Sequence, residues 1–179
     1  MLSLSDEELM VRVQEGDGAA YRMLFDRHHE RVYGYLVRRV RSPELARDLF
    51  QETFLSVHRA RHTWTPGRAF RPWLYGIATN AVRDHFRRTA RRPMEVAIER
   101  ARTVTHENPV GAMQLERAIG QLPDGLREAF LLGAVEGFDH NEVAEQLGIN
   151  PDAARARISR ARAQLRAVLN EDSLDEEPT

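Results

Sequence analysis

DHNEVAEQLGINPDAARARISRARAQLR, residues 139–166, decides the fold of this chain, because it predicts a helix, a tight turn and a second helix. Asp139 is placed to cap the first helix, and Glu142 follows at the spacing of a capping box. Gly148 supplies the left-handed residue that ends this helix. Two helices joined by a short glycine-containing turn are typical of the helix-turn-helix of DNA-binding proteins.

The second helix is opened by Asn150 as its cap and by Pro151 at its first position, where a missing N–H costs no hydrogen bond. Drawn at 100° per residue, it separates into two faces. The face expected to dock on the core carries Ala154, Ile158, Ala161 and Leu165. The opposite face carries the short side chains of Asp152, Ala156, Ser159 and Ala163, flanked by Arg155 and Arg162 on one side and by Arg157 and Arg160 on the other.

Short side chains let a helix sit deep in a major groove, and arginines at its margins can reach guanine edges or phosphates. The second helix is therefore predicted to read DNA. The alternative is an ordinary amphipathic helix with a solvated arginine face.

The composition of the chain narrows its class. With 179 residues it has room for one domain or two small ones. It contains no cysteine, so disulfides and cysteine-based metal sites are excluded. No apolar run approaches a membrane span, and the first fifteen residues are too charged for a signal peptide, so we expect a cytoplasmic protein without membrane insertion.

Charge is distributed unevenly, although the net charge is only −1. All 26 basic residues are arginines, and a single acid, Asp84, interrupts the arginines between Arg59 and Arg92. The helix-turn-helix adds a second basic block, and the acids collect elsewhere. Two separate basic surfaces predict two contacts with nucleic acid.

The chain is expected to be all-α, with two small helical domains joined by a flexible linker. The expected helices are a short one from Ser5 to Gly16, a long one capped by Asp17, a third from Ser42 to about Arg61, a fourth from Pro72 to about Thr89, and two more over about 113–121 and 124–135 before the helix-turn-helix. The predicted divisions are an N-terminal domain over 1–92, a linker over 93–112, a helix-turn-helix domain over 113–170 and an acidic disordered tail over 171–179.

Aromatic residues are expected to form the core of the N-terminal domain: Phe25, Tyr33, Tyr35, Phe50, Phe54, Trp73 and Phe86. On the third helix the predicted buried face is Leu45, Ala46, Leu49, Phe50, Thr53, Phe54 and Val57, and the opposite face is Glu44, Asp48, Gln51, Glu52 and Leu55. On the fourth helix the residues predicted to pack inward are Trp73, Ile77, Ala78 and Ala81.

Three stretches together resemble one family: DLFQETFLSV at 48–57, FRPWLYGIATNAVRDHFRR at 70–88, and LPDGLREAFLLGAVEGFDHNEVAEQLGI at 122–149 with RARISRARAQLR at 155–166. In this combination the chain resembles a bacterial RNA-polymerase sigma factor of the sigma-70 family. The resemblance is to the small extracytoplasmic-function (ECF) class, which keeps only regions two and four. It implies two helical domains, no cofactor and no enzymatic activity, and a factor that gives the polymerase its promoter specificity.

The resemblance also assigns surfaces to partners. It implies that the third helix docks on the clamp helices of the polymerase's largest subunit, through Asp48, Gln51, Glu52 and Leu55. Region four would dock on the flap of the polymerase. An exposed leucine among acids favours a partner surface over a solvated helix face. Family members are often held by an anti-sigma factor, so such a partner is an open possibility here, and a monomer is expected.

Region two implies capture of the melted −10 DNA strand, which needs cations for the backbone and a pocket or π-face for an unstacked base. The residues implied are Trp64, Arg68, Phe70, Arg71, Asn80, Arg83, Asp84, Arg87 and Arg88. For Trp73 a place in the core is favoured over stacking on a base, and for Trp64 both interpretations stay open.

Region four implies recognition of −35 duplex DNA through Arg155, Ala156, Arg157, Ser159, Arg160 and Arg162. Here the chain departs from many family members, because Ala153 and Ala156 replace two hydroxyl residues that could bind phosphate or base. Asp152 at the helix start suits the macrodipole but repels phosphate. The −35 sequence it prefers is therefore left open by the resemblance.

Two other functions fit some of the residues. A stand-alone helix-turn-helix regulator would leave the acidic third helix unexplained. A metal hydrolase could use His58 and His62, which lie four residues apart as metal ligands do on a helix. Arg59 stands where a zinc protease carries its general-base glutamate, and no third ligand is evident.

Overall fold

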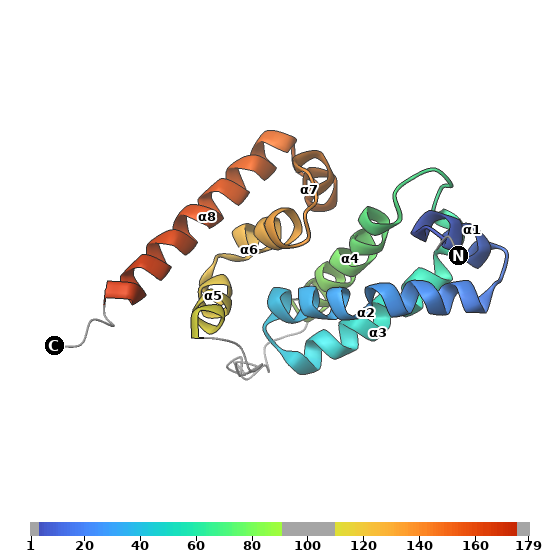
Figure 1. Ribbon diagram of the computed structural model, residues 1–179, viewed down its shortest axis with the longest axis horizontal. Helices are drawn as coiled ribbons and strands as arrows, with labels where there is room; N and C mark the ends of the chain where they lie inside the picture. The colour runs from blue at the N-terminus through green and yellow to red at the C-terminus, as the bar shows by residue number, and fades with distance from the viewer. Residues whose placement is uncertain (1–3, 91–109, 175–179) are drawn as a thin grey trace. The chain divides into compact units, whose positions relative to one another are not determined.

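The computed structural model describes residues 4–90 and 110–174, and every regular element in those ranges is helical (Figure 1). The chain forms two compact units, Met1–Arg100 and Ala101–Thr179. The predicted all-α class is confirmed. Most of the predicted linker, residues 93–109, and the last five residues of the predicted tail lie outside the described residues, as do Arg91 and Arg92 of the basic block.

The first unit contains α1 (Asp6–Gln14), α2 (Gly18–Val40), α3 (Pro43–Arg59), the short 3-10 helix η1 (Arg61–Thr63) and α4 (Phe70–Ala90). The three predicted caps are confirmed. Ser5 and Glu8 form a capping box on α1, Asp17 accepts two backbone N–H groups at the start of α2, and Ser42 accepts the N–H of Leu45 at the start of α3.

The core of the first unit lies where α2 packs against α1 and α3, and α3 against α4. Tyr35 of α2 and Tyr75 of α4 are both 1% exposed, with their ring centroids 5.3 Å apart. The hydroxyl of Tyr35 lies 3.2 Å from that of Thr79, so this buried oxygen has a hydrogen-bond partner. These contacts fix α4 against the rest of the unit.

Of the four residues predicted to pack inward on α4, only Ala78 is confirmed as buried. Its buried residues are Phe70, Leu74, Tyr75, Ala78, Thr79 and Val82, whereas Trp73, Ile77 and Ala81 are half-buried. Phe86 was expected in the core but is 44% exposed. The reason is that Val82 is the last buried residue of α4, so Phe86 lies one turn beyond the core.

The second unit contains α5 (Val110–Gln121), α6 (Asp124–Phe130), the π-helix η2 (Leu131–Val135), α7 (His140–Leu147) and α8 (Pro151–Leu174). Helices α5, α6 and α7 all pack on α8. Helix α8 continues to Leu174, so the first four residues predicted to belong to the disordered tail are helical instead. Arg127 is 6% exposed and donates to the carbonyls of Ile119, Gly120 and Leu122, which ties the end of α5 to α6.

Gly133 in η2 lies in close contact with α8. A Cβ built on Gly133 would lie 2.5 Å from Cδ1 of Ile158 and 3.3 Å from its Cγ1. Ile158 is itself 3% exposed and has little room to move. The absence of a side chain at Gly133 therefore lets α8 lie close against the segment that leads into α7.

Candidate nucleic-acid and protein interfaces

The helix-turn-helix in the second unit has the predicted local geometry. Asp139 and Glu142 form a complete capping box on α7, with both bonds 2.9 Å long. Gly148 has φ +64°, and the N–H of Ile149 donates back to the carbonyl of Ala144 at 3.0 Å. Asn150 then accepts the N–H of Ala153 through its side-chain oxygen at 2.7 Å. These bonds set the direction in which α8 leaves the turn.

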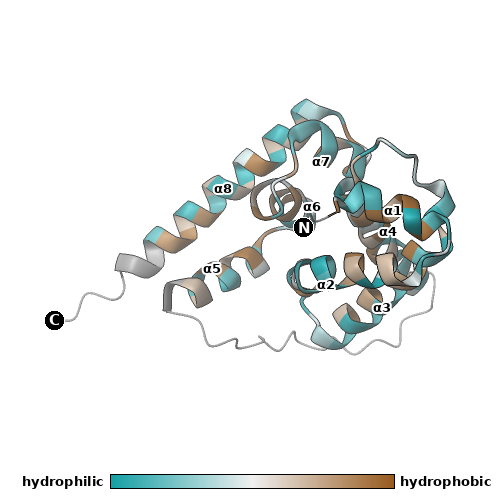
Figure 2. Cartoon of the chain, turned by 45° about the vertical axis from the view of Figure 1, so that its right-hand side comes forward, coloured by the Kyte–Doolittle hydropathy of each residue, from teal (hydrophilic) through white to brown (hydrophobic). Residues whose placement is uncertain are grey.

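Helix α8 separates its faces as the wheel predicted. Ala154, Ile158, Ala161 and Leu165 are all at most 4% exposed. Figure 2 shows apolar and polar residues alternating along the helix. Of the residues predicted to contact −35 DNA, Arg155, Ser159, Arg160 and Arg162 are exposed, while Ala156 and Arg157 are half-buried. The exposed side of α8 thus carries arginines on both sides of the short side chains of Asp152, Ala156, Ser159 and Ala163, which we call the short-chain strip.

Arg157 differs from the other arginines of α8 in what it touches. A Cβ built on Gly125 would lie 3.6 Å from Nη1 of Arg157, so this guanidinium lies over the start of α6. The guanidinium therefore lies at one edge of the exposed face of α8. A cation at this edge suits a phosphate better than a base edge, because phosphates flank the groove.

The acidic face of α3 lies on the surface of the first unit. Glu44, Asp48, Gln51 and Glu52 are all exposed, and Leu55 among them is 52% exposed. Glu52 accepts the hydroxyl of Ser56 at 3.2 Å and lies 3.6 Å from a guanidinium nitrogen of Arg59. Both groups of that ion pair are about half exposed or more, so the pairing is weak and can be exchanged for a partner's cation.

The acidic face adjoins the basic end of α4. Burial lowers the pKa of the His85 imidazole below its ordinary value of 6.5, and Arg88 lowers it further, whereas Asp48 acts in the opposite direction. His85 therefore lies within electrostatic reach of both Asp48 on α3 and Arg88 on α4. The two surfaces predicted for polymerase and for DNA meet at this point.

The exposed side of α4 carries a strip of the residues predicted for −10 DNA. Asn80, Asp84, Arg87 and Arg88 are exposed, and Arg83 is half-buried. Arg87 pairs with Asp84 at 2.8 Å. The half-buried Arg71 has its guanidinium carbon 5.9 Å from the ring centroid of Tyr75. From Arg71 to Arg88 the strip runs about 25 Å at 1.5 Å per residue.

Two of the residues predicted for the −10 site lie in the core instead. Trp64 is 2% exposed and Phe70 is 1% exposed. Neither ring offers a face on which a base could stack. The half-buried Trp73 packs with its ring 5.9 Å from that of Phe70, so the core place favoured for it is only partly confirmed, and the question left open for Trp64 is decided in favour of the core. Among the predicted loop residues only Arg68 is fully exposed at the surface.

Sequence reasoning missed the side chains of α1 that hold this loop. The amide of Gln14 donates to the carbonyls of Arg61 and Trp64, and the carboxylate of Glu7 accepts the N–H of Phe70. These bonds span 47, 50 and 63 residues of sequence. No local pattern signals contacts of that range, and only a knowledge of how α1 packs could have found them.

The metal-site alternative gains no support from the geometry. His58 packs its ring edge-on against Tyr21, with centroids 5.6 Å apart. Within residues 4–90 and 110–174 no cluster of three or more His, Asp or Glu side chains is arranged to hold a metal ion. In the same ranges no helix has the length and apolar character needed to cross a membrane.

Comparison with known proteins identifies both units. The family description "Sigma-70 region 2" matches residues 24–92, and "Sigma-70, region 4" matches residues 112–165. The first match covers α3 and α4, and the second covers the helix-turn-helix. Each of the predicted surfaces therefore falls within a matched region.

The similarity to curated proteins runs over nearly the whole chain. The chain is 40% identical over 173 residues to the RNA polymerase sigma factor CarQ of Myxococcus xanthus, which covers 93% of this chain and 98% of CarQ. It is 32% identical over 178 residues to the ECF RNA polymerase sigma-E factor of Haemophilus influenzae, covering 90% and 94%. The solved structure of CnrH in complex with the cytosolic domain of CnrY matches with a TM-score of 0.69 and 31% identity, over 93% of this chain and 98% of that one.

Proposed function

Because this chain belongs to the sigma-70 family of RNA polymerase sigma factors, in the ECF class, we propose which of its residues carry each step of promoter-specific initiation. Sigma factors are transcription-initiation factors and not enzymes. The proposal assigns polymerase binding to α3, capture of melted −10 DNA to α4 and its preceding loop, and −35 reading to α8. Its place of action is the cytoplasm, where the polymerase works.

The observation that carries the proposal is the exposed acidic face of α3 in a chain whose other contact surfaces are basic. DNA repels such a face, so its partner is a protein. Leu55, which is 52% exposed, offers apolar area at the C-terminal end of this face, next to Gln51 and Glu52. Exposed apolar area beside polar side chains is typical of a protein interface. We assign Asp48, Gln51, Glu52 and Leu55 to the clamp helices of the polymerase, and the second unit to the flap.

The −10 assignment keeps the exposed or half-buried polar residues of the prediction and leaves out the buried rings. It comprises Arg68, Arg71, Asn80, Arg83, Asp84, Arg87 and Arg88. Arginines track the phosphates of a single strand, and Asn80 can hydrogen-bond the edge of an unstacked base. Trp64 and Phe70 act from the core, by holding the loop in place.

The −35 assignment places α8 in the major groove, with its short-chain strip against the base edges. Arg155 and Arg160 flank that strip, are exposed and are assigned to guanine, whereas Arg157, which lies over the start of α6, is assigned to a phosphate. Ala156 and Ser159 permit close approach, and Arg162 extends the contact along the helix.

A protein partner that blocks these surfaces is part of the proposal. CnrH, a chain of 31% identity, is known in complex with the cytosolic domain of CnrY. We propose that an anti-sigma factor binds this chain over the acidic face of α3. Such a partner would compete with core polymerase for the protein, and Asp48→Arg would weaken both complexes.

The test of the proposal is assembly of holoenzyme from core polymerase and the full chain. The double variant Asp48→Arg with Glu52→Arg should lose core binding while its circular dichroism stays unchanged. A matched control is Asp26→Arg with Glu30→Arg, which makes the same change of charge at two exposed acids of α2. The assignment of α3 fails if both double variants bind core polymerase equally at moderate salt.

A further inference from the structure

Helix α1 reaches both ends of the loop that the proposed function places on −10 DNA. We define the anchored loop as residues 64–70. It begins directly after η1 and ends with Phe70, the first residue of α4. Its terminal rings, Trp64 and Phe70, are buried, and the residues between them are exposed. An exposed loop that must recognise a base needs a fixed shape, and here the fixing groups come from a distant helix.

At the entry of the loop, Gln14 provides a double attachment. Its side-chain nitrogen donates to the carbonyl of Arg61 at 2.8 Å and to that of Trp64 at 2.7 Å. A primary amide has two N–H donors, and both are used. The carbonyl of Arg61 belongs to the first residue of η1, and that of Trp64 to the residue that directly follows η1. Gln14 therefore satisfies the last turn before the loop and fixes where the loop begins.

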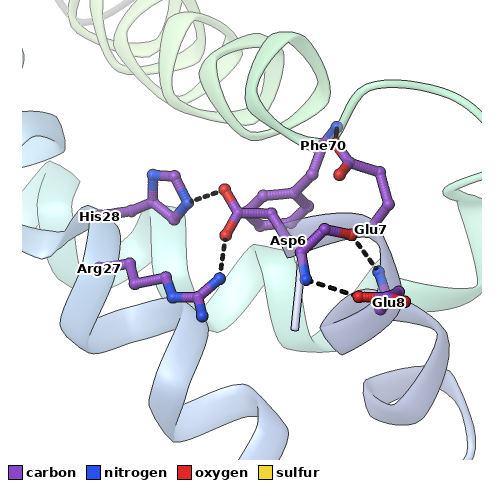
Figure 3. Close-up of polar contacts among 7 residues, drawn as sticks. Asp6, Glu7, Glu8, Arg27, His28 and Phe70 are labelled. Atoms are coloured by element: carbon purple, nitrogen blue, oxygen red, sulfur yellow. Dashed lines mark hydrogen bonds and ion pairs between the residues drawn. The ribbon is translucent and has the colours of Figure 1, made fainter. Parts of the chain in front are cut away.

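At the exit of the loop, Glu7 takes the part of a helix cap. Its carboxylate accepts the N–H of Phe70 at 3.0 Å, as Figure 3 shows. Ala69, which precedes α4, has no side-chain oxygen with which to cap it. The first N–H groups of a helix need acceptors, and negative charge is favoured there. Glu7 therefore caps α4 from another helix and fixes the direction in which α4 begins.

A second attachment at the exit runs through His28. Asp6 of α1 lies 2.8 Å from the guanidinium of Arg27 and 2.7 Å from Nε2 of His28 (Figure 3). The His28 ring is 6% exposed and lies 5.4 Å from the ring of Phe70. Asp6 thus holds the ring against which Phe70 rests. Consecutive residues of α1 hold both the backbone and the side chain of Phe70.

The tip of the loop is itself a defined turn. The N–H of Arg68 donates to the carbonyl of Thr65 at 3.1 Å, and Gly67 has φ +88°. With Pro66 at the second position and Gly67 at the third, this is a type II turn. Arg68 occupies its last position and is exposed. Because the loop is attached to α1 at both ends and its tip is a defined turn, the backbone at Arg68 has one orientation.

We propose that Gln14 and Glu7 are positioning residues for −10 recognition, which rests on the proposed function of this loop. They touch no DNA in this account. They hold the type II turn and the start of α4 in the register that lets Arg68 and the α4 strip meet the melted strand together. Losing either attachment should reduce discrimination between −10 sequences, because the loop then samples several orientations.

The chain offers a matched pair of substitutions. Gln14→Glu keeps the size of the side chain but replaces both donors by acceptors, so it loses both bonds to the carbonyls. Glu7→Gln keeps an oxygen that can accept the N–H of Phe70, so it should retain function where Glu7→Ala does not. Glu8→Ala is the control for general damage to α1, because Glu8 bonds only within the capping box with Ser5.

The experiment uses holoenzyme of each full-length variant on fork templates whose −10 region is already melted and randomised. Wild-type holoenzyme should select a −10 sequence. Gln14→Glu, Gln14→Ala and Glu7→Ala should lose roughly five- to tenfold of that preference, with core binding unchanged. Glu7→Gln and Glu8→Ala should keep it. Tryptophan fluorescence on the same samples would establish that each variant is folded at the assay temperature.

The possible results distinguish a failure of the positioning role of Gln14 and Glu7 from a failure of the −10 assignment on which it rests. If wild-type holoenzyme selects no −10 sequence, the assignment of −10 reading to this unit fails, and the inference with it. If wild type selects a sequence and the Gln14 and Glu7→Ala variants select it equally well, the positioning role alone is overturned. A loss in Glu8→Ala as large as that in Gln14→Glu would also overturn it, since the effect would then come from α1 as a whole.

Discussion

The two units reach their contact surfaces by different routes. In the second unit the helix-turn-helix is set by neighbours in sequence, since Asp139 and Glu142 cap α7, Gly148 ends it and Asn150 caps α8. In the first unit the loop before α4 is set by α1, through bonds that span about 50 residues and more. A surface of the first kind tolerates changes elsewhere in its unit, whereas one of the second kind depends on them.

The largest expected effect would test whether Trp64 belongs to the core. Trp64→Ala should cost about 3–5 kcal/mol of unfolding free energy, the usual loss for a buried aromatic. Trp73→Ala, at a half-buried position, should cost less. Both tryptophans of the chain lie in the first unit, so the fluorescence of the remaining one follows urea unfolding of that unit. A Trp64→Ala protein of wild-type stability would restore stacking on DNA as its role.

The next effect concerns the close approach in the second unit. Gly133→Ala should cost about 1–3 kcal/mol by overpacking against Ile158, and it should weaken −35 duplex binding because α8 must shift. Adding Ile158→Val removes the clashing methyl group and should recover part of the loss, so the two changes will not be additive. Hydrogen exchange of the α8 amides measures the loss of stability in the single variant and its recovery in the double variant. Additive losses would mean that the contact at Gly133 is relieved in another way.

Much of the local structure could be predicted from the sequence alone. The all-α class, the helix caps, the inward face of α8 and the exposed face of α3 follow from local periodicity and capping chemistry, and the structure confirms them. The inward face of α4 could not be predicted as well. Trp73, Ile77 and Ala81 are apolar, as are most of the residues that are buried, so the pattern alone did not distinguish two neighbouring faces.

The anchored loop could not be predicted for a different reason. Trp64 and Phe70 stand among arginines, which is the composition of a nucleic-acid surface, yet both rings are buried. Their burial depends on α1 and α2, which lie far away in sequence. The polar residues that hold the loop, Gln14 and Glu7, have no unusual neighbours. The residues assigned to DNA and polymerase on the exposed faces remain predictions.

A smaller effect distinguishes two arginines within α8. Arg160→Ala should relax preference at one or two −35 base pairs by about 1–3 kcal/mol, as expected for a guanine contact. Arg157→Ala should weaken all sequences alike and lower the salt slope by about one unit, as expected for a phosphate contact. Competing a randomised −35 library at two salt concentrations measures both. An identical profile for the two variants would argue against the distinction drawn from the place of Arg157 over Gly125.

The smallest expected effect lies where the two surfaces of the first unit meet. Burial and Arg88 lower the pKa of His85 below 6.5, so the unfolded chain binds its proton more readily than the folded one. Stability from this residue is therefore present above about pH 6.5 and falls as the pH drops below it. With solvent screening the loss should be at most about 0.5 kcal/mol. In thermal unfolding at a series of pH values, the stability of His85→Asn should fall slightly less steeply below pH 6.5 than that of wild type. A steeper fall would show that His85 has the opposite effect.

We propose that this chain docks on the polymerase through α3 and reads two separate promoter elements with its two units. The most direct test maps transcription start sites made by core polymerase and the full chain on a library randomised over both elements. Arg160→Ala should change only the upstream −35 preference, and Asn80→Ala only the −10 preference and the extent of melting. Asp48→Arg with Glu52→Arg should abolish all of these transcripts. Transcripts that persist in the double variant, or an Asn80→Ala variant that alters the −35 preference instead, would contradict the account.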